Sequence, residues 1–425
     1  MRILFVTCPS KTHLYAMAPL AWALKTAGHE VQVASQIDSV NFSADHIAHT
    51  GLPAVPLGND LDVSTSIAAA IAASEASSPP PPAPAEPGRR QTQREYAAED
   101  PYAELDSLAR EHFTFFNSDP LIDGAVRYAR RWRPDLVIWD GMTMAYAGPV
   151  AARAAGAAHA RFVFGPDSVA QLRAAVPDRD PLRDVVQPIL ERYGLAYDEQ
   201  TLTGHWSINA MPPWIWYPPG MHYLWMRPSP FNGPSVVPDW VLDERERRRV
   251  CITLGLSFRD LDAGASAGAL LEAVADLDAE VIVTLSRDQV AALPGLPANV
   301  RAVDFVPLTA LLPTCSAVVH HGGYGTFVSA LEHGVPQLMV PGKFGNDKFW
   351  GPLAYLDYME PQGAGLYVSE PDQLTPDVLR DKLLRVLKEP AFGRNAARLR
   401  AQSDELPTPN EVVPIIERLT ARYRP

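Results

Sequence analysis

The chain has 425 residues, of which 47% are hydrophobic and 20% are charged, and its formal net charge at pH 7 is −12. This length exceeds what one ordinary hydrophobic core organises, so it predicts two domains with separate cores. The acidic balance argues against nucleic acid or an anionic membrane surface as the main partner. An anionic small ligand would have to be held locally, by backbone amides and a few cations.

Cysteine usage and the first residues predict a soluble, cytoplasmic protein. The chain has three cysteines, far apart and without a CxxC pair: Cys8, Cys251 and Cys315. This pattern predicts buried thiols in a reducing compartment and no structural zinc. Residues 1–15 have a short apolar run without a small-residue cleavage site, so they predict a first strand and not a signal peptide. No apolar stretch reaches membrane-spanning length.

The first half of the chain alternates strand and helix signals. The apolar run RILFVTC at 2–8 predicts a buried parallel strand, and a helical pattern follows it until Gly28. Further strands are predicted at EVQVAS (30–35), PDLVIWD (134–140) and HARFVFG (159–165), with a helix at AGPVAARAAG (147–156). This repetition predicts a doubly wound parallel sheet.

Two stretches interrupt the pattern. Residues 64–94 are rich in Pro, Ala and Ser, and bury too little apolar surface to order themselves. They predict a mobile surface loop, with a flap over a cleft or a docking segment as the functional alternative. Residues 206–240 are crowded with Trp, Tyr and Pro and show neither the helical nor the strand periodicity of apolar residues. They predict an interdomain crossover, whose aromatic side chains either pack near a cleft or only hold the linker.

A second alternation of strands and helices begins at RVCITLGLS (249–257), which is similar to RILFVTCPS in the first half. Strands are predicted at 279–285, 300–306, 317–322 and 336–341, and helices at 265–277, 324–334, 377–389 and 410–423. The domains predicted from this order are 1–215 and 239–405, with a linker at 216–238 and a returning C-terminal helix at 406–425. Two such halves predict a cleft where the carboxyl ends of both sheets face each other, which is where open α/β sheets bind ligands.

The turn VVHHGGYGT, residues 318–326, is predicted to bind an anion. Glycines between a strand and a helix let a ligand approach the backbone, and the free N–H groups of a helix start favour pyrophosphate. Gly322, Gly323, Gly325 and Thr326 are assigned to this cradle, with His320 as the side-chain contact. A turn built only for packing is the alternative.

The first turn of the chain carries a candidate base. It reads TCPSKTHLY without GxGxxG, which disfavours a dinucleotide-dependent dehydrogenase. His13 lies at a helix start, whose positive end predicts a lowered pKa and a neutral imidazole that accepts a proton. Asp140, at the end of a strand of the same sheet, is predicted to orient His13. Asp140 as the base itself, and His13 as a plain surface residue, are the alternatives.

Metal chemistry is not predicted. Four DxD triplets are scattered away from the predicted strand ends, as chance produces in an acidic chain. The adjacent His320 and His321 alternate along a strand and cannot point into one site.

These motifs resemble the actinomycete antibiotic glycosyltransferases of the GT-B fold, family 1, which attach deoxysugars to macrolide and other polyketide aglycones. The resemblance covers nearly the whole chain, in the blocks HLYAMAPLAWALKTAGHEV, TGHWSINAMPP, NGPSVVPDWVLDERERRRVCITLG, VRAVDFVPLTALLPTCSAVVHHGGYGT and HGVPQLMVP. It implies two Rossmann-like domains facing a cleft, with the acceptor bound by 1–215 and the nucleotide sugar by 239–405.

The resemblance also implies an activity: inverting, metal-independent transfer of a deoxysugar from a thymidine-diphosphate (TDP) sugar, without a cofactor, in antibiotic biosynthesis. By this likeness His13 and Asp140 match the base and its partner. The remaining assignments are diphosphate binding by Ser257, His320 and the turn Gly322–Thr326, nucleobase binding by Phe305, Val306 and Pro307, and sugar binding by Asn346, Asp347 and Lys348. Lys348 stands where many relatives carry Gln, which leaves the donor sugar open.

The implied ligands are a nucleotide-sugar donor and a hydrophobic aglycone. An auxiliary activator protein and a homodimer are left open by the resemblance. Two alternatives to transfer are a nucleotide-sugar epimerase on the same fold and a helper subunit that binds the nucleotide without chemistry. The presence of both His13 and Asp140 argues against the helper.

Overall fold

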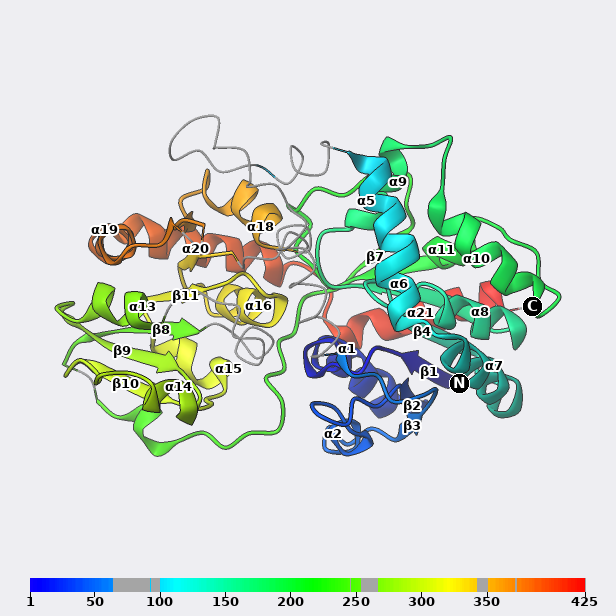
Figure 1. The fold of residues 1–425 in the computed structure, drawn as a ribbon, viewed down its shortest axis with the longest axis horizontal. Coiled ribbons are helices and arrows are strands. Elements are labelled where there is room, and N and C mark those ends of the chain that lie inside the picture. The colour runs from blue at the N-terminus through cyan, green and yellow to red at the C-terminus, as the bar shows by residue number, and fades with distance from the viewer. Residues whose placement is uncertain are drawn as a thin grey trace. The chain divides into compact units, whose positions relative to one another are not determined.

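The computed structural model describes residues 1–63, 92, 100–244, 246–253, 267–341, 351–370 and 373–424. The chain divides into two compact units (Figure 1). Unit 1 comprises Met1–Ser66, Ala97–Ser229 and Leu406–Pro425, and unit 2 contains Pro230–Glu405. The division falls inside the linker predicted at 216–238. Nearly all of the Pro-rich segment 64–94 lies outside the described residues.

Unit 1 is built on a seven-stranded parallel sheet in the order β3-β2-β1-β4-β5-β6-β7. Its strands are β1 Arg2–Val6, β2 Glu30–Ser35, β3 Ala54–Pro56, β4 Leu136–Asp140, β5 Ala158–Val163, β6 Trp206–Asn209 and β7 Tyr223–Trp225. The central β4 and β5 are buried at every residue, as their continuous apolar sequences predict.

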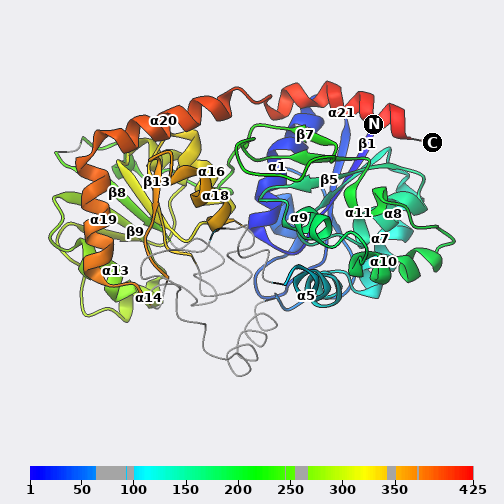
Figure 2. The same cartoon turned by 90° about the horizontal axis from the view of Figure 1, so that it is seen from above.

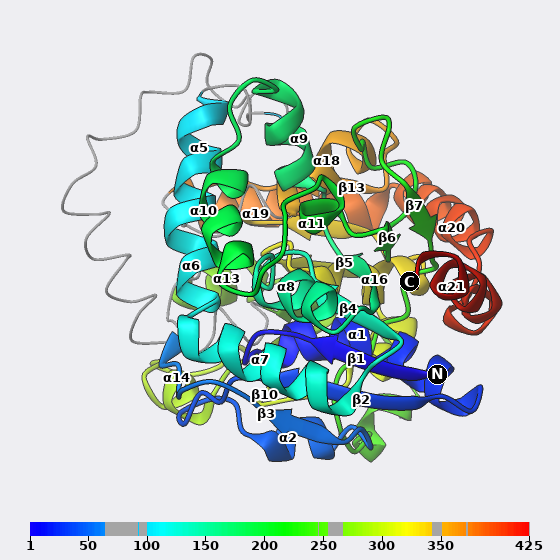
Figure 3. The same ribbon diagram turned by 90° about the vertical axis from the view of Figure 1, so that its right-hand side faces the viewer.

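The helices of unit 1 include α1 Lys11–Thr26, α2 Ala44–Ala48, α7 Asp119–Trp132, α8 Ala147–Ala154, α9 Ser168–Ala175, α10 Pro181–Glu191 and α11 Gln200–Thr203. Helices α5 Pro101–Ser107 and α6 Phe113–Phe116 continue into each other through a π-helical turn at Leu108–His112 (Figure 3). The C-terminal helix α21, Pro409–Tyr423, contacts α1 and β5 of the same unit.

Unit 2 has a six-stranded parallel sheet in the order β10-β9-β8-β11-β12-β13. Its strands are β8 Arg248–Thr253, β9 Ala279–Thr284, β10 Val300–Val303, β11 Ala317–His320, β12 Gln337–Met339 and β13 Gly365–Tyr367. Its helices include α13 Ala267–Val274, α14 Arg287–Ala291, α15 Leu308–Leu311, α16 Tyr324–Glu332, α18 Pro352–Met359, α19 Pro376–Lys388 and α20 Pro390–Asp404. Helix α20 contacts α16 and, at an angle, the preceding helix α19 (Figure 2).

Each sheet has a point where its strand order reverses direction, between β1 and β4 in unit 1 and between β8 and β11 in unit 2. Two doubly wound parallel sheets confirm the predicted fold class. Crevices at such reversal points, outside the carboxyl ends of the strands, are where this architecture binds ligands. The topology therefore singles out the residues that follow β1, β4, β8 and β11.

The aromatic stretch 206–240 differs from the crossover predicted for it. It forms β6 and β7, the last two strands of the unit 1 sheet, before the chain leaves that unit after Ser229. Prolines separate the two strands, and each strand is only three or four residues long, so the sequence showed neither a strand nor a helix periodicity.

None of the described helices combines the length and apolarity that a membrane crossing requires.

Candidate active site

One candidate site lies at the reversal point of unit 1. Asp140 is the last residue of β4, and β4 pairs directly with β1. Helix α1 follows β1 after a short turn, and His13 lies in its first turn. The parallel pairing thus brings together two side chains that are 127 residues apart in the chain.

His13 and Asp140 form a close hydrogen-bonded pair. The distance from His13 Nδ1 to Asp140 Oδ2 is 2.6 Å, and the Asp140 side chain is 0% exposed whereas that of His13 is 18% exposed. Thr143 Oγ1 donates to Asp140 Oδ2 at 2.7 Å, and the Met142 N–H donates to Oδ1 at 2.9 Å. Because Asp140 accepts at both oxygens, it holds the proton of His13 on Nδ1. That tautomer leaves Nε2 as the free base of the imidazole.

Neighbouring groups shift the pKa of both His13 and Asp140. Burial lowers the pKa of His13, but the Cys8 sulfur and the Asp140 carboxylate outweigh it and raise that pKa well above its ordinary value. Burial opposes ionisation of Asp140, but His13, Thr143 and the Met142 amide hold the pKa of its carboxyl below its ordinary value.

The raised pKa of His13 corrects the expectation that the helix start lowers it. A helix end carries only a partial charge. The Cys8 sulfur and the Asp140 carboxylate, whose Oδ2 lies 2.6 Å from His13 Nδ1, both raise this pKa and outweigh it. The lowered pKa of Asp140, together with its complete burial, disfavours Asp140 as the base. The pair is therefore arranged as a base, His13, with an orienting anion, Asp140.

Cys8 completes a group of three potential metal ligands. Within the described ranges, Cys8, His13 and Asp140 each offer a ligand atom, and these atoms lie within 4.8 Å of one another. The hydrogen bonds above already occupy both Asp140 oxygens, and a cation would have to displace the Nδ1 proton of His13. The donor set therefore fits a hydrogen-bonded dyad better than a metal centre. Metal independence itself stays a prediction.

Sequence reasoning missed the side chains that surround the dyad. The ring of Phe164 meets the His13 ring edge-on, with 5.0 Å between centroids. His112 Nε2 lies 2.7 Å from the Met142 carbonyl oxygen, and burial lowers the pKa of its imidazole. Thr143 and Phe164 come one to three residues after strand ends. That position was the only signal that could have found them.

A separate candidate site, in unit 2, is the turn between β11 and α16. Gly322 has φ +97°, in the left-handed region, and a Cβ there would lie 2.5 Å from Cβ of Pro352, so the turn requires glycine. Gly323 is the N-cap of α16, and no side chain caps this end of the helix. Among the described residues the space beside Gly325 is open, since a Cβ there would meet none of their atoms within 4 Å. An uncapped helix start beside open space is suited to bind an anion.

The structure places the His320 side chain inside the protein, beside the turn. His320 is 1% exposed, its Nδ1 accepts a hydrogen bond from the Gly322 N–H at 3.1 Å, and its Nε2 donates to Gln337 Oε1 at 2.9 Å. Burial lowers the pKa of its imidazole to about 4. Both ring nitrogens are hydrogen-bonded within the protein, so His320 fixes the conformation of the turn, and its contact with a diphosphate stays a prediction.

The neighbouring His321 occupies the position expected for His320. Its side chain is partly exposed, and its Nε2 lies 2.6 Å from where a Cβ of Gly323 would be, which places the ring over the start of α16. Burial lowers the pKa of this imidazole to about 3, so it is neutral at physiological pH. Strand alternation turns the two histidines to opposite sides, and the sequence did not indicate which one faces inward.

The other predicted donor contacts are partly described. Phe305, which follows β10, is 40% exposed, while Val306 is 3% exposed and packs in the core of unit 2. Pro307 is buried next to it. Nucleobase contact would therefore involve the Phe305 ring and the backbone of this segment. The remaining predicted contacts lie outside the described residues: Ser257, Asn346, Asp347 and Lys348.

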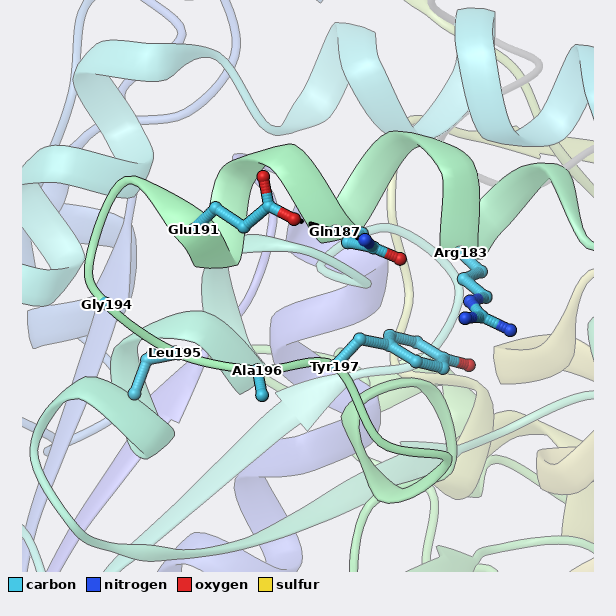
Figure 4. Close-up of a pocket in the computed structure, with 7 residues that line it drawn as sticks. All are labelled: Arg183, Gln187, Glu191, Gly194, Leu195, Ala196 and Tyr197. Carbon is cyan, nitrogen blue, oxygen red and sulfur yellow. Dashed lines mark hydrogen bonds between the residues drawn. The ribbon is translucent and has the colours of Figure 1, made fainter.

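A hollow on unit 1 lies apart from these residues. It has a volume of about 490 Å³ and is lined by side chains of α10 and the following loop (Figure 4). Gln187 Nε2 donates to Glu191 Oε1 at 3.1 Å, and the Arg183 guanidinium lies 5.1 Å from the centre of the Tyr197 ring. We assign this hollow no ligand.

Two glycine substitutions separate folding from anion binding at the turn. Gly322→Ala forces a side chain into a left-handed position against Pro352 and is expected to lower the free energy of unfolding by about 2 kcal/mol or more. The Cβ of Gly325→Ala meets no atom of the described residues within 4 Å, and this helical Gly→Ala change is expected to be neutral or stabilising by up to about 1 kcal/mol. Its methyl group would nevertheless occupy the space over the helix start, and we expect about tenfold weaker binding of thymidine diphosphate, the scale of a lost charge-assisted hydrogen bond. Thermal unfolding measures the stability of both variants, and calorimetric titration measures their affinity for thymidine diphosphate. An unchanged affinity in Gly325→Ala would contradict the assignment of this turn to anion binding.

Comparisons with known proteins cover the whole chain. Two models for erythromycin biosynthesis protein CIII-like proteins match it, the N-terminal domain over residues 22–255 and the C-terminal domain over 268–419. An aclacinomycin-T 2-deoxy-L-fucose transferase of Streptomyces galilaeus is 43% identical, over 100% of this chain and 97% of its own. A 10-deoxymethynolide desosaminyltransferase of Streptomyces venezuelae is 39% identical, over 100% and 98%.

Solved structures agree with these matches. The crystal structure of the glycosyltransferase VinC in complex with DTDP superposes with a TM-score of 0.81 at 40% identity, covering 99% of this chain and 100% of that one. The spinosyn forosaminyltransferase SpnP gives a TM-score of 0.80 at 35% identity, covering 99% of both chains.

Proposed function

Since the chain belongs to the family of erythromycin biosynthesis protein CIII-like glycosyltransferases, we propose that it transfers a deoxysugar from a TDP-sugar to a polyketide or macrolide-type aglycone, with inversion and without a metal ion. The relatives named above are transferases of deoxysugars. The epimerase and helper alternatives are disfavoured accordingly.

The observation that carries the chemistry is the 2.6 Å pair of His13 and Asp140 at the reversal point of unit 1. Nε2 of His13 accepts the proton of an acceptor hydroxyl as its oxygen attacks the anomeric carbon of the sugar. A new carbon–oxygen bond forms on one face while the bond to the diphosphate breaks on the other, and the bonding pair leaves with TDP. This direct displacement inverts the anomeric configuration. Asp140 stabilises the imidazolium that results.

The donor side is assigned to the turn between β11 and α16. The N–H groups at the uncapped start of α16 favour the negative diphosphate, and they stabilise it further as charge accumulates on the leaving group. His321 adds a neutral ring over the same helix start. Phe305 offers an exposed aromatic face for the thymine base.

A single assay tests the proposal. The protein is incubated with a TDP-deoxysugar and a panel of polyketide aglycones, and release of TDP is followed with and without EDTA. Release that depends on an aglycone, persists with EDTA and yields the inverted anomer by NMR is the expected result. Sugar isomerisation without an acceptor would indicate the epimerase, and binding without turnover the helper.

A further inference from the structure

Helix α18 contributes a buried hydroxyl that nothing in the described protein satisfies. Tyr355 is 0% exposed, and its hydroxyl has no hydrogen-bond partner. Buried polar groups in proteins are nearly always paired, because removing a hydroxyl from water without a partner is costly. An unpaired phenol in a well-packed helix therefore calls for a specific explanation.

The Tyr355 ring is anchored on the first turn of α16. It stacks on the Phe327 ring with 3.9 Å between centroids and 11° between planes. The Phe327 N–H makes the first helical hydrogen bond of α16, to the Gly323 carbonyl oxygen at 3.0 Å. The Tyr355 ring therefore lies against the first turn of α16, and α18 lies beside α16 in two perpendicular views (Figures 1 and 2).

The hydroxyl reaches the glycine turn itself. A Cβ placed on Gly351, the N-cap of α18, would lie 2.9 Å from the Tyr355 hydroxyl and 3.1 Å from the Gly322 carbonyl oxygen. The hydroxyl and the Gly322 carbonyl oxygen therefore both border the space that a side chain at position 351 would fill. Any other residue at 351 would cover the hydroxyl, whereas glycine leaves its approach to the turn open.

The chemistry of the group suits a phosphate oxygen. Burial raises the pKa of the Tyr355 phenol, so it remains a hydrogen-bond donor throughout the physiological range. The start of α16, which has nine residues, favours an anion at the same place. A phosphate oxygen is a strong acceptor, and a hydrogen bond to a charged acceptor is stronger than one to a neutral group.

We propose that Tyr355 is a donor-binding residue, whose hydroxyl donates a hydrogen bond to a diphosphate oxygen of the nucleotide sugar held at the start of α16. The identity of the ligand rests on the proposed function. The position of the hydroxyl rests only on the stacking and glycine contacts above. The donor site thereby extends to α18, which no sequence signal marked.

The test is Tyr355→Phe, which removes only the hydroxyl and keeps the stacked ring. Calorimetric titration of the full chain with TDP and with thymidine separates the phosphate contact from the base contact. We expect Tyr355→Phe to bind TDP about tenfold more weakly, the scale of one hydrogen bond to a charged group, and thymidine unchanged. The KM for the TDP-sugar should rise by a similar factor with a smaller change in kcat. Tyr358→Phe, on the same helix, is the matched control and should leave both affinities unchanged.

The outcomes distinguish this inference from the function on which it rests. Equal affinity of wild type and Tyr355→Phe for TDP, with a higher unfolding temperature of the variant, overturns the inference and leaves the function standing. An equal loss of TDP and thymidine affinity also overturns it, because that result reports loosened packing. A wild-type chain that binds neither TDP nor a TDP-sugar overturns the proposed function itself.

Discussion

Replacing His13 by alanine is expected to lower kcat of sugar transfer by about two to four orders of magnitude, the range of general-base catalysis. Nε2 of this imidazole is the atom that accepts the hydroxyl proton, and no other ring in the described part of unit 1 is hydrogen-bonded to Asp140 in its place. Affinity for TDP should be nearly unchanged, because the nucleotide is assigned to the turn in unit 2. Steady-state kinetics and TDP titration measure the two effects separately.

The matched control for this experiment is His49→Ala. His49 is an exposed histidine of the same unit that lies at the end of α2. Its removal should change neither kcat nor TDP affinity. Turnover of His13→Ala at the wild-type rate would remove His13 as the base, and the raised-pKa pair would then have only a structural role.

Replacing Asp140 by asparagine is expected to cost a comparable factor, about two to four orders of magnitude in kcat, through the wrong tautomer of His13. If Oδ1 keeps the Met142 N–H, the new amide N–H group faces His13 Nδ1 and donates to it. The remaining ring proton of His13 then sits on Nε2, which no longer accepts. Thr143 Oγ1 also loses its acceptor, which should lower the free energy of unfolding by about 1–3 kcal/mol.

The same variant has a signature in the pH profile of kcat/KM. The Asp140 carboxylate helps to raise the pKa of His13, so wild-type activity should fall as the pH drops through that raised value. In Asp140→Asn this charge is gone, so the pKa of His13 falls and the acidic limb moves to lower pH. An acidic limb at the same pH in both proteins would show that a group other than His13 titrates there.

Much of the architecture follows from local sequence patterns. Continuous apolar runs such as Leu136–Asp140 and the helical spacing after them specify buried parallel strands and their covering helices. Strand order in such folds is constrained by right-handed crossovers, so the positions of His13 and Asp140 at one sheet edge could be predicted from their place after strands. The short strands β6 and β7 could not, because three or four residues between prolines carry no measurable period.

Strand and helix periods are local properties of the chain, so they were sufficient to predict which residue types stand at the ends of the strands. Which atoms those residues present to a ligand depends on packing between distant segments. Gln337 on β12 and the Gly322 amide occupy both nitrogens of His320 and leave His321 at the helix start. The Asp140 charge from β4 helps to raise the pKa of His13, and the packing of α18 on α16 brings the Tyr355 hydroxyl beside the turn. Each of these outcomes depends on distances between segments remote in sequence, since electrostatic and packing energies vary steeply over a few ångströms.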